Sequence, residues 1–377
     1  MAIPDYNLNI PDNSFVTLDY VVEPFNNSDD VARWVTLGYT AKFTGAMCDM
    51  RNTQPKWTCE LVKFFTDNLG WKNVKLSSKN EWGKLRSVVV GIANHANWPS
   101  NDPVFAKEGE KTLWKETPVP SGPVPNWIIE EANEDLNVLA STLLHLGVEV
   151  WRPSTMNFAK LGGMYNYCPR DRLIIAGSKV VDPAMMYPCR NQEIDALKFV
   201  TDAASDVIVM PRDKKMILDA ANVCRLGDDW LYLKSPSGNK SAYNWLKKQL
   251  PEINIELCDF YSGVHIDSTI VPLREGLVLL NGSRVDESTC PKVFDNWEKI
   301  YFNDAVAQEF HEYPYASKWI GLNLLVVDNN TIIADVNQIH LIKVLEAHNF
   351  TVIPLELRHS RTLGGGFHCV TLDLVRD

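Results

Sequence analysis

The run Gly364-Gly365-Gly366-Phe367-His368-Cys369 places a cysteine directly after a histidine and three glycines. A thiolate is the most nucleophilic side chain near neutral pH, and glycines permit backbone angles that other residues avoid and a close approach of substrate. The run therefore makes Cys369 a candidate nucleophile, with His368, Gly365 and Gly366 as supporting residues. The alternative is a glycine turn before a buried strand, with Cys369 as a small core residue.

Two other segments carry side chains that suit a partner for this cysteine. In His265-Ile266-Asp267, a strand would place the histidine and the aspartate on one face, because side chains alternate along a strand. Asp219 lies inside the apolar run 217–223, and a buried aspartate needs a partner such as a histidine, which a carboxylate orients. The structural alternatives are an exposed strand for the first segment and a turn or helix cap for Asp219.

A fourth segment, Cys168-Pro169-Arg170-Asp171, precedes the apolar run 173–176. Taken alone, it predicts a turn with an exposed ion pair before a strand rather than a catalytic site. Four such segments establish no mechanism by themselves. Their order along the chain becomes informative only if it matches the order found in a known family.

In this order and with similar separations, the segments resemble those of the amidinotransferases of the guanidine-modifying (pentein) superfamily, most closely the glycine amidinotransferases. The histidine directly before the cysteine is the form that amidinotransferases have. The resemblance covers roughly residues 78–377. The matching segments are 168–171, 218–227, 265–269, Arg284, 317–319 and 363–369.

The resemblance implies a catalytic triad of Cys369 as nucleophile, His265 as general acid and base, and Asp219 as the orienting carboxylate. It also implies arginine-binding positions at Asp171, Asp267, Arg284 and Ser317. Close relatives have a serine, an aspartate and a tryptophan where this chain has Ala316, Asn222 and Val370. Two of these replacements, the alanine and the valine, leave the chemistry intact but affect the acceptor and the anchoring of arginine.

The implied reaction moves the amidino group of L-arginine to glycine through a covalent amidino-cysteine, giving L-ornithine and guanidinoacetate without a metal or an organic cofactor. Aspartates around Cys369 should raise its pKa, so we expect a thiol until the guanidinium binds and promotes thiolate formation. Three alternatives remain open: the same chemistry with another acceptor amine, an arginine hydrolase or deiminase, and an arginine-binding protein without catalysis.

The elements that must position these residues alternate between short β-rich runs and helical patterns, of which 127–146 is the clearest. A helix, a Gly or Asn cap and a strand occur at 144–150 and again at 346–354, which suggests repeated modules. The resemblance implies an α/β fold, a five-bladed αβ propeller of ββαβ modules over residues 78–377. Residues 1–77 are predicted to be an N-terminal extension of unknown role, ordered because it is rich in aromatic residues.

The composition describes a globular protein: 377 residues, 45% hydrophobic and 22% charged, with a formal net charge of -10. The net negative charge argues against nucleic acid as a partner. No apolar run reaches the roughly 18 to 20 residues of a membrane helix. The eight cysteines form no CxxC pair, so the sequence signals neither a zinc site nor a disulfide framework. We expect a cytoplasmic protein whose partners are arginine and an acceptor amine, and the resemblance implies a homodimer.

Overall fold

The computed structural model describes residues 74–107, 118–213, 215–261 and 263–377. The predicted N-terminal extension therefore lies outside the described residues, except for its last four. Those four adjoin the rest of the chain, because the Ser77 amide donates a hydrogen bond to the Leu374 carbonyl at 2.8 Å. The domain boundary after residue 77 remains a prediction.

Five three-stranded sheets in the described part repeat one pattern, in which the first two strands pair antiparallel and the third is parallel to the second. One sheet joins the two ends of the described chain, with β17 (Thr371–Arg376) against β1 (Leu85–Val90) and then β4 (Glu149–Trp151). The others are β5 (Ile174–Ala176), β6 (Lys179–Asp182) and β7 (Asp206–Val209); β8 (Val223–Leu226), β9 (Asp229–Leu233) and β10 (Asn254–Cys258); β11 (Ile270–Arg274), β12 (Leu277–Asn281) and β13 (Glu298–Phe302); and β14 (Leu325–Asp328), β15 (Thr331–Asp335) and β16 (Thr351–Leu355).

A helical segment connects the second and third strands of each sheet, because a parallel pair requires a crossover. The predicted helix at 127–146 is α5, shifted by one residue. Gly147 and Asn349, the two caps of the recurring sequence pattern, have left-handed φ angles of 79° and 64°. The crossovers are α5 (Asn126–His145), η4 (Pro188–Leu197) with α7 (Lys198–Ala203), α8 (Lys240–Gln249), η6 (Lys292–Phe294) and α9 (Ile339–Ala347).

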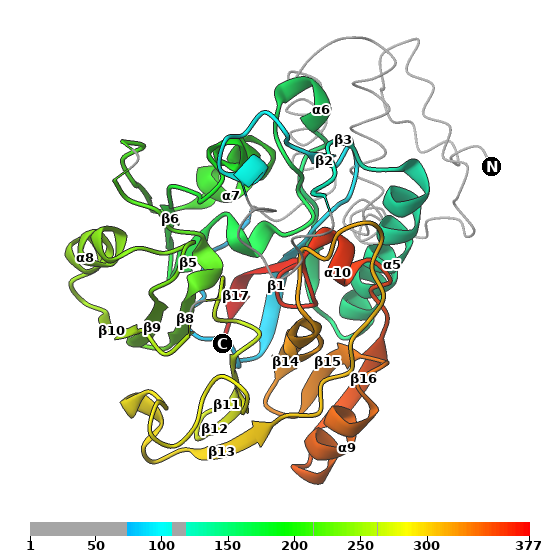
Figure 1. The fold of residues 1–377 in the computed structure, drawn as a ribbon. Coiled ribbons are helices and arrows are strands. Elements are labelled where there is room, and N and C mark those ends of the chain that lie inside the picture. The colour runs from blue at the N-terminus through cyan, green and yellow to red at the C-terminus, as the bar shows by residue number, and fades with distance from the viewer. Residues whose placement is uncertain (1–73, 108–117, 214, 262) are drawn as a thin grey trace, which may run out of the picture.

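The remaining elements are short: β2 (Asn97–Trp98), β3 (Gly122–Pro123), α6 (Phe158–Leu161), α10 (Ser360–Leu363), η2 (Phe105–Lys107), η3 (Pro169–Asp171), η5 (Ala220–Asn222) and η7 (Lys318–Leu322). Figure 1 shows β8, β11 and β14 on the inner side of their sheets, with α8 and α9 at the periphery of the molecule. Among the described helices, none has both the length and the apolar character needed to cross a membrane.

The helices pack apolar faces against their sheets. Leu136, Leu139 and Leu143 of α5 are fully buried in one cluster with Val88 and Val90 of β1. Burial of a leucine side chain stabilises a fold by about 1.5–3 kcal/mol, so this face alone holds α5 on its sheet. The α/β character predicted from the sequence is confirmed.

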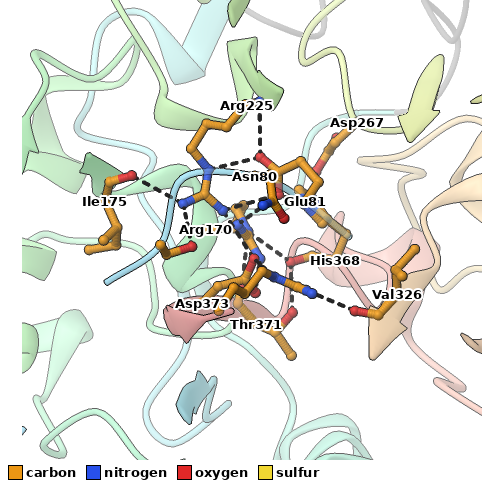
Figure 2. A network of polar contacts seen from close by, with 12 residues as sticks. Asn80, Glu81, Arg170, Ile175, Arg225, Asp267, Val326, His368, Thr371 and Asp373 are labelled. Carbon is orange, nitrogen blue, oxygen red and sulfur yellow. Dashed lines mark hydrogen bonds and ion pairs between the residues drawn. The ribbon is translucent and has the colours of Figure 1, made fainter. Parts of the chain in front are cut away.

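Buried charges join several sheets at the centre of the molecule. Asp373 of β17 is 0% exposed and accepts hydrogen bonds from Arg170 at 2.6 Å, Arg225 at 3.0 Å and Arg376 at 2.7 Å. Arg225 also donates to Glu81 through Nε at 2.9 Å and Nη2 at 3.1 Å, as Figure 2 shows. Three cations and two anions thereby compensate one another away from water, which buried charges require.

We predict that R225M lowers the free energy of unfolding by about 3–5 kcal/mol, because it leaves the Glu81 and Asp373 carboxylates buried with less compensation. Urea denaturation measures this loss. As a control, E252Q removes the exposed ion pair between Lys179 and Glu252 at 2.9 Å, and should change the free energy of unfolding by less than about 1 kcal/mol. Equal losses in both variants would contradict the importance of the buried network.

Candidate active site

The predicted site residues come mostly from loops that lead into the first strands of the five sheets. Equivalent ends of similar modules therefore supply groups that are far apart in the sequence. Asp171 precedes β5, Asp219 precedes β8, His265 and Asp267 precede β11, Ser317 precedes β14, and Cys369 precedes β17. Arg284 differs, because it follows β12, the second strand of its sheet.

Cys369, Asp267 and Asp219 are buried, and they lie in one cluster with His265, whose side chain is 16% exposed. The Cys369 thiol donates a hydrogen bond from Sγ to Oδ2 of Asp267 at 3.3 Å. The ring of His265 lies with Nε2 3.1 Å from Oδ2 of Asp219 and Nδ1 3.6 Å from Oδ1 of Asp171. Because Asp171 and Asp267 both perturb the pKa of His265 and that of Cys369, the nucleophile and the imidazole share one electrostatic environment.

The prediction that His265-Ile266-Asp267 forms a strand is wrong. These residues lie in the loop between β10 and β11, and His265 has a left-handed φ of 55°, which a strand does not allow. The backbone is held there by Asn222, whose Oδ1 accepts a hydrogen bond from the His265 amide at 3.0 Å, and by the Tyr261 hydroxyl, which donates to the His265 carbonyl. Tertiary contacts thus bring the two side chains to one cluster where strand periodicity does not.

The glycine run allows the Cys369 loop to pack closely. A Cβ on Gly365 would lie 2.4 Å from Sγ of Cys168, and a Cβ on Gly366 would lie 2.7 Å from Cβ of Asn323. Side chains at either position would push the loop away from these neighbours. Asn323 in turn fixes the backbone of Cys369, because its Oδ1 accepts a hydrogen bond from the Cys369 amide at 2.9 Å.

Asp171 is buried, which corrects the expectation of an exposed ion pair in this segment. Its Oδ2 accepts a hydrogen bond from Nη1 of Arg190 at 2.9 Å, and Arg190 is held by Glu193 through Nε at 2.9 Å and Nη2 at 3.0 Å. The other oxygen, Oδ1, is buried and accepts no hydrogen bond from the described residues. Arg190 therefore fixes Asp171 by one oxygen, while the second lies 3.6 Å from Nδ1 of His265 and can still accept a hydrogen bond.

Arg284 and Ser317 lie side by side, as the predicted anchoring site requires. Arg284 donates through Nη1 to the Thr269 hydroxyl at 2.8 Å and through Nη2 to the Ser317 hydroxyl at 3.4 Å. Its guanidinium carbon lies 4.7 Å from the centre of the Tyr261 ring. Both hydrogen-bond partners are neutral, so the Arg284 charge suits an anionic group of a ligand.

The electrostatics of the cluster separate the roles of the thiol and the imidazole. Burial, followed by the charge of Asp267, raises the pKa of Cys369 well above its ordinary value, so the resting residue is a thiol. This direction agrees with the expectation from the sequence, but its main cause is burial rather than the aspartates. Burial opposes a charge on His265, but the carboxylates of Asp171, Asp219 and Asp267 outweigh it and raise the pKa to about 9.

Several residues that shape the site escaped sequence reasoning. Asn323 lies within an apolar run between Leu322 and Leu324, which is the same signal that singled out Asp219. Glu81 and Arg190 stand in no pattern that distinguishes them from surface charges. Among the described ranges, no group of three or more His, Cys, Asp or Glu side chains is arranged to hold a metal ion.

Comparisons with known proteins place this geometry in context. The chain is 38% identical over 336 residues to inosamine-phosphate amidinotransferase 1 of Streptomyces griseus, covering 80% of this chain and 97% of that protein. The solved structure of the inosamine-phosphate amidinotransferase from S. griseus has a TM-score of 0.75 at 37% identity, covering 80% of this chain and 97% of that one. The mitochondrial glycine amidinotransferase of Xenopus tropicalis is 26% identical over 349 residues, covering 79% and 82%. A scan against protein-family models finds no match.

We predict that the His265 imidazole titrates near pH 9, and that D219N lowers this pKa by about one unit or more, because it removes a charge and weakens a hydrogen bond. Since the pKa in the folded state lies above the ordinary 6.5, the stability that charged His265 contributes is fully present below about pH 6.5. It is lost as the pH rises through about 9.

Titration of the histidine ring nitrogens by NMR measures this pKa, and the spectrum of H265N identifies the signal. A wild-type His265 that titrates near 6.5 would show that the three carboxylates do not hold its proton.

Proposed function

Because this chain belongs to the amidinotransferases of the guanidine-modifying (pentein) superfamily, we propose that it takes the amidino group from L-arginine through a covalent intermediate on Cys369. In this proposal Cys369 is the nucleophile, His265 the general acid and base, and Asp219 the orienting carboxylate. The observation that carries it is Oδ1 of buried Asp171, which accepts no hydrogen bond from the described residues and lies in one cluster with the Asp267 oxygen that accepts the Cys369 thiol hydrogen bond.

Two carboxylates bind the guanidinium of arginine. A buried carboxylate oxygen without a donor is costly, and a guanidinium N–H at Oδ1 of Asp171 removes that cost. A second pair of N–H groups at Asp267 takes the place of the thiol hydrogen bond and leaves the guanidino carbon facing sulfur. The bound cation also stabilises the thiolate of Cys369, whose proton passes to solvent.

The first half-reaction forms one carbon–sulfur bond and breaks one carbon–nitrogen bond. The thiolate adds to the guanidino carbon, giving a tetrahedral centre. His265, which is protonated at neutral pH, gives its proton to Nε of the substrate arginine, the nitrogen that becomes the side-chain amine of ornithine. The bond between this nitrogen and the former guanidino carbon then breaks, and ornithine leaves. The amidino group remains on Cys369 as an isothiouronium.

The second half-reaction reverses these roles. His265 is now neutral and takes a proton from the incoming amine, whose nitrogen attacks the amidino carbon. The carbon–sulfur bond breaks, and the thiolate leaves to be protonated again as the new guanidino product departs. No step requires a metal or an organic cofactor, because the imidazole supplies both proton transfers.

We propose glycine as the acceptor, which gives guanidinoacetate. Support comes from the sequence resemblance and from the 26% identity to a glycine amidinotransferase. A second candidate is an inosamine phosphate, favoured by the 38% identity to a relative that bears this name. The two acceptors differ in length: if Arg284 binds the α-carboxylate of arginine, we expect glycine to be too short to contact Arg284 while its amine attacks the amidino carbon, whereas the phosphate of a larger acceptor can do so.

We also propose that the five sheets are the five blades of an αβ propeller over residues 78–377. The repeated strand order, with all the predicted site residues except Arg284 preceding the first strand of a sheet, supports this arrangement. A homodimer and a cytoplasmic location remain predictions from the sequence.

Incubation with L-arginine and glycine should give ornithine and guanidinoacetate in equal amounts, detected by mass spectrometry. Arginine alone should leave one amidino group on the peptide that contains Cys369. C369S should lower turnover more than about a thousandfold, because it lacks the sulfur nucleophile. Ornithine with urea, or citrulline with ammonia, would indicate hydrolysis, and arginine binding without any product would identify a non-catalytic protein.

R284M should raise KM for arginine by about tenfold or more, because a charge-assisted hydrogen bond to the α-carboxylate is lost. Mixing the isolated amidino-enzyme with acceptor then separates the two candidates. With glycine as acceptor, R284M should leave the rate of the second half-reaction unchanged. With an inosamine phosphate as acceptor, R284M should lower this rate. R86M at the exposed Arg86–Asp377 pair is the control, and an unchanged KM for arginine in R284M would contradict the anchoring role.

A further inference from the structure

His368 has a side chain that is 13% exposed, and both of its ring nitrogens face carboxylates. Nδ1 lies 2.9 Å from Oδ2 of Asp267, and Nε2 lies 3.2 Å from Oε2 of Glu81. Figure 2 shows the imidazole between these two acids, beside the arginine network. The two carboxylates come from distant parts of the chain, since Glu81 precedes β1 and Asp267 precedes β11.

A neutral imidazole has a single N–H, so it would leave a lone pair against one of the two carboxylates. Only the imidazolium donates to both. Burial and Arg170 oppose this charge, but the hydrogen bonds to Asp267 and Glu81 outweigh them and raise the pKa of His368. The ring geometry and the direction of the pKa shift therefore agree on a cation.

The imidazole and the nucleophile share one acceptor atom. Oδ2 of Asp267 accepts from His368 Nδ1 at 2.9 Å and from the Cys369 thiol at 3.3 Å. A cavity of about 20 Å³ adjoins Asp267, His368 and Glu81, and its remaining lining is apolar, including Ile266, Leu324 and Val326. Space of that size holds at most about one water, so the charges here depend on protein partners.

We propose that His368 is a positioning residue for the proposed nucleophile, an imidazolium held between Asp267 and Glu81 that fixes the Asp267 carboxylate against the Cys369 sulfur and offsets its negative charge. Without this cation, Asp267 would repel the thiolate that the reaction needs. The inference rests on the proposed role of Cys369, but its tests require no substrate.

The charged groups around His368 come from five parts of the chain. Glu81, Asp267 and the thiol of Cys369 contact it or its shared acceptor, and Arg170 acts on its charge from η3. Behind these lie Arg225 of β8 and Asp373 of β17, which bind Glu81 and Arg170, and His265, which acts on Asp267. Glu81 is itself held ionised by Arg225 and Arg170, so it does not take the proton from His368.

Alkylation of Cys369 by iodoacetamide tests the charge of His368. At pH 8, H368N and H368Q should both alkylate about tenfold more slowly than the wild type, since a lost cation near sulfur raises its pKa by about one unit. The modified peptide is quantified by mass spectrometry over pH 6 to 10, and the whole rate profile should move to higher pH. H340N, at an exposed histidine of α9, should alkylate at the wild-type rate.

The two variants also separate charge from hydrogen bonding. Asparagine retains a donor near Nδ1 and glutamine one near Nε2, so equal slowing in both identifies the charge as the active property. Unchanged or faster alkylation would overturn the proposal, because a residue that only packs the loop would expose the thiol when it is replaced.

A measurement on the wild-type protein keeps the proposal testable if these variants fold poorly. Nitrogen NMR of labelled histidines should show both ring nitrogens of His368 protonated at pH 7.5. A neutral ring at that pH would overturn the proposal whatever the variants do. Neither experiment depends on the donor or acceptor, so failure here is distinct from failure to transfer an amidino group.

Discussion

The structure depends on the pairing of buried arginines with buried carboxylates where the sheets meet. Each of these charges would destabilise the fold if it were left alone, so the strands that carry Arg225 and Asp373 must come together. The same pairing fixes two loops of the site. Arg170, which binds Asp373, directly precedes Asp171, and Asp373 follows Cys369 by four residues. The buried ion pairs thus both stabilise the fold and position the loops that carry Asp171 and Cys369.

The site is built with more negative than positive charge, which suits a cationic donor. Asp171, Asp219 and Asp267 surround His265, and they raise the pKa of its imidazole. Burial, together with Asp267 and Asp171, raises the pKa of Cys369, so the resting residue is a thiol. In the proposed reaction, the charge of the bound guanidinium promotes thiolate formation, which would limit reactions of the sulfur before substrate binds.

The sequence singled out residues that the structure brings together, but it predicted their local structure less well. Cys369 and Asp219 stood out because a thiol beside glycines and a carboxylate in an apolar run are locally unusual. The strand expected at His265 was wrong, because hydrogen bonds with Tyr261 and with Asn222, which lies 43 positions away along the chain, decide that backbone. Glu81 gave no local signal at all.

By itself, the sequence determined the alternation of helices and strands, the chemical inventory of the site and, through its resemblance to a family, the kind of reaction. Only the tertiary structure decided that Oδ1 of Asp171 accepts no hydrogen bond from the described residues and that His368 lies between two carboxylates. The reason is that protonation and hydrogen bonding depend on distances through space and on burial, and groups more than 280 residues apart, such as Glu81 and His368, set both.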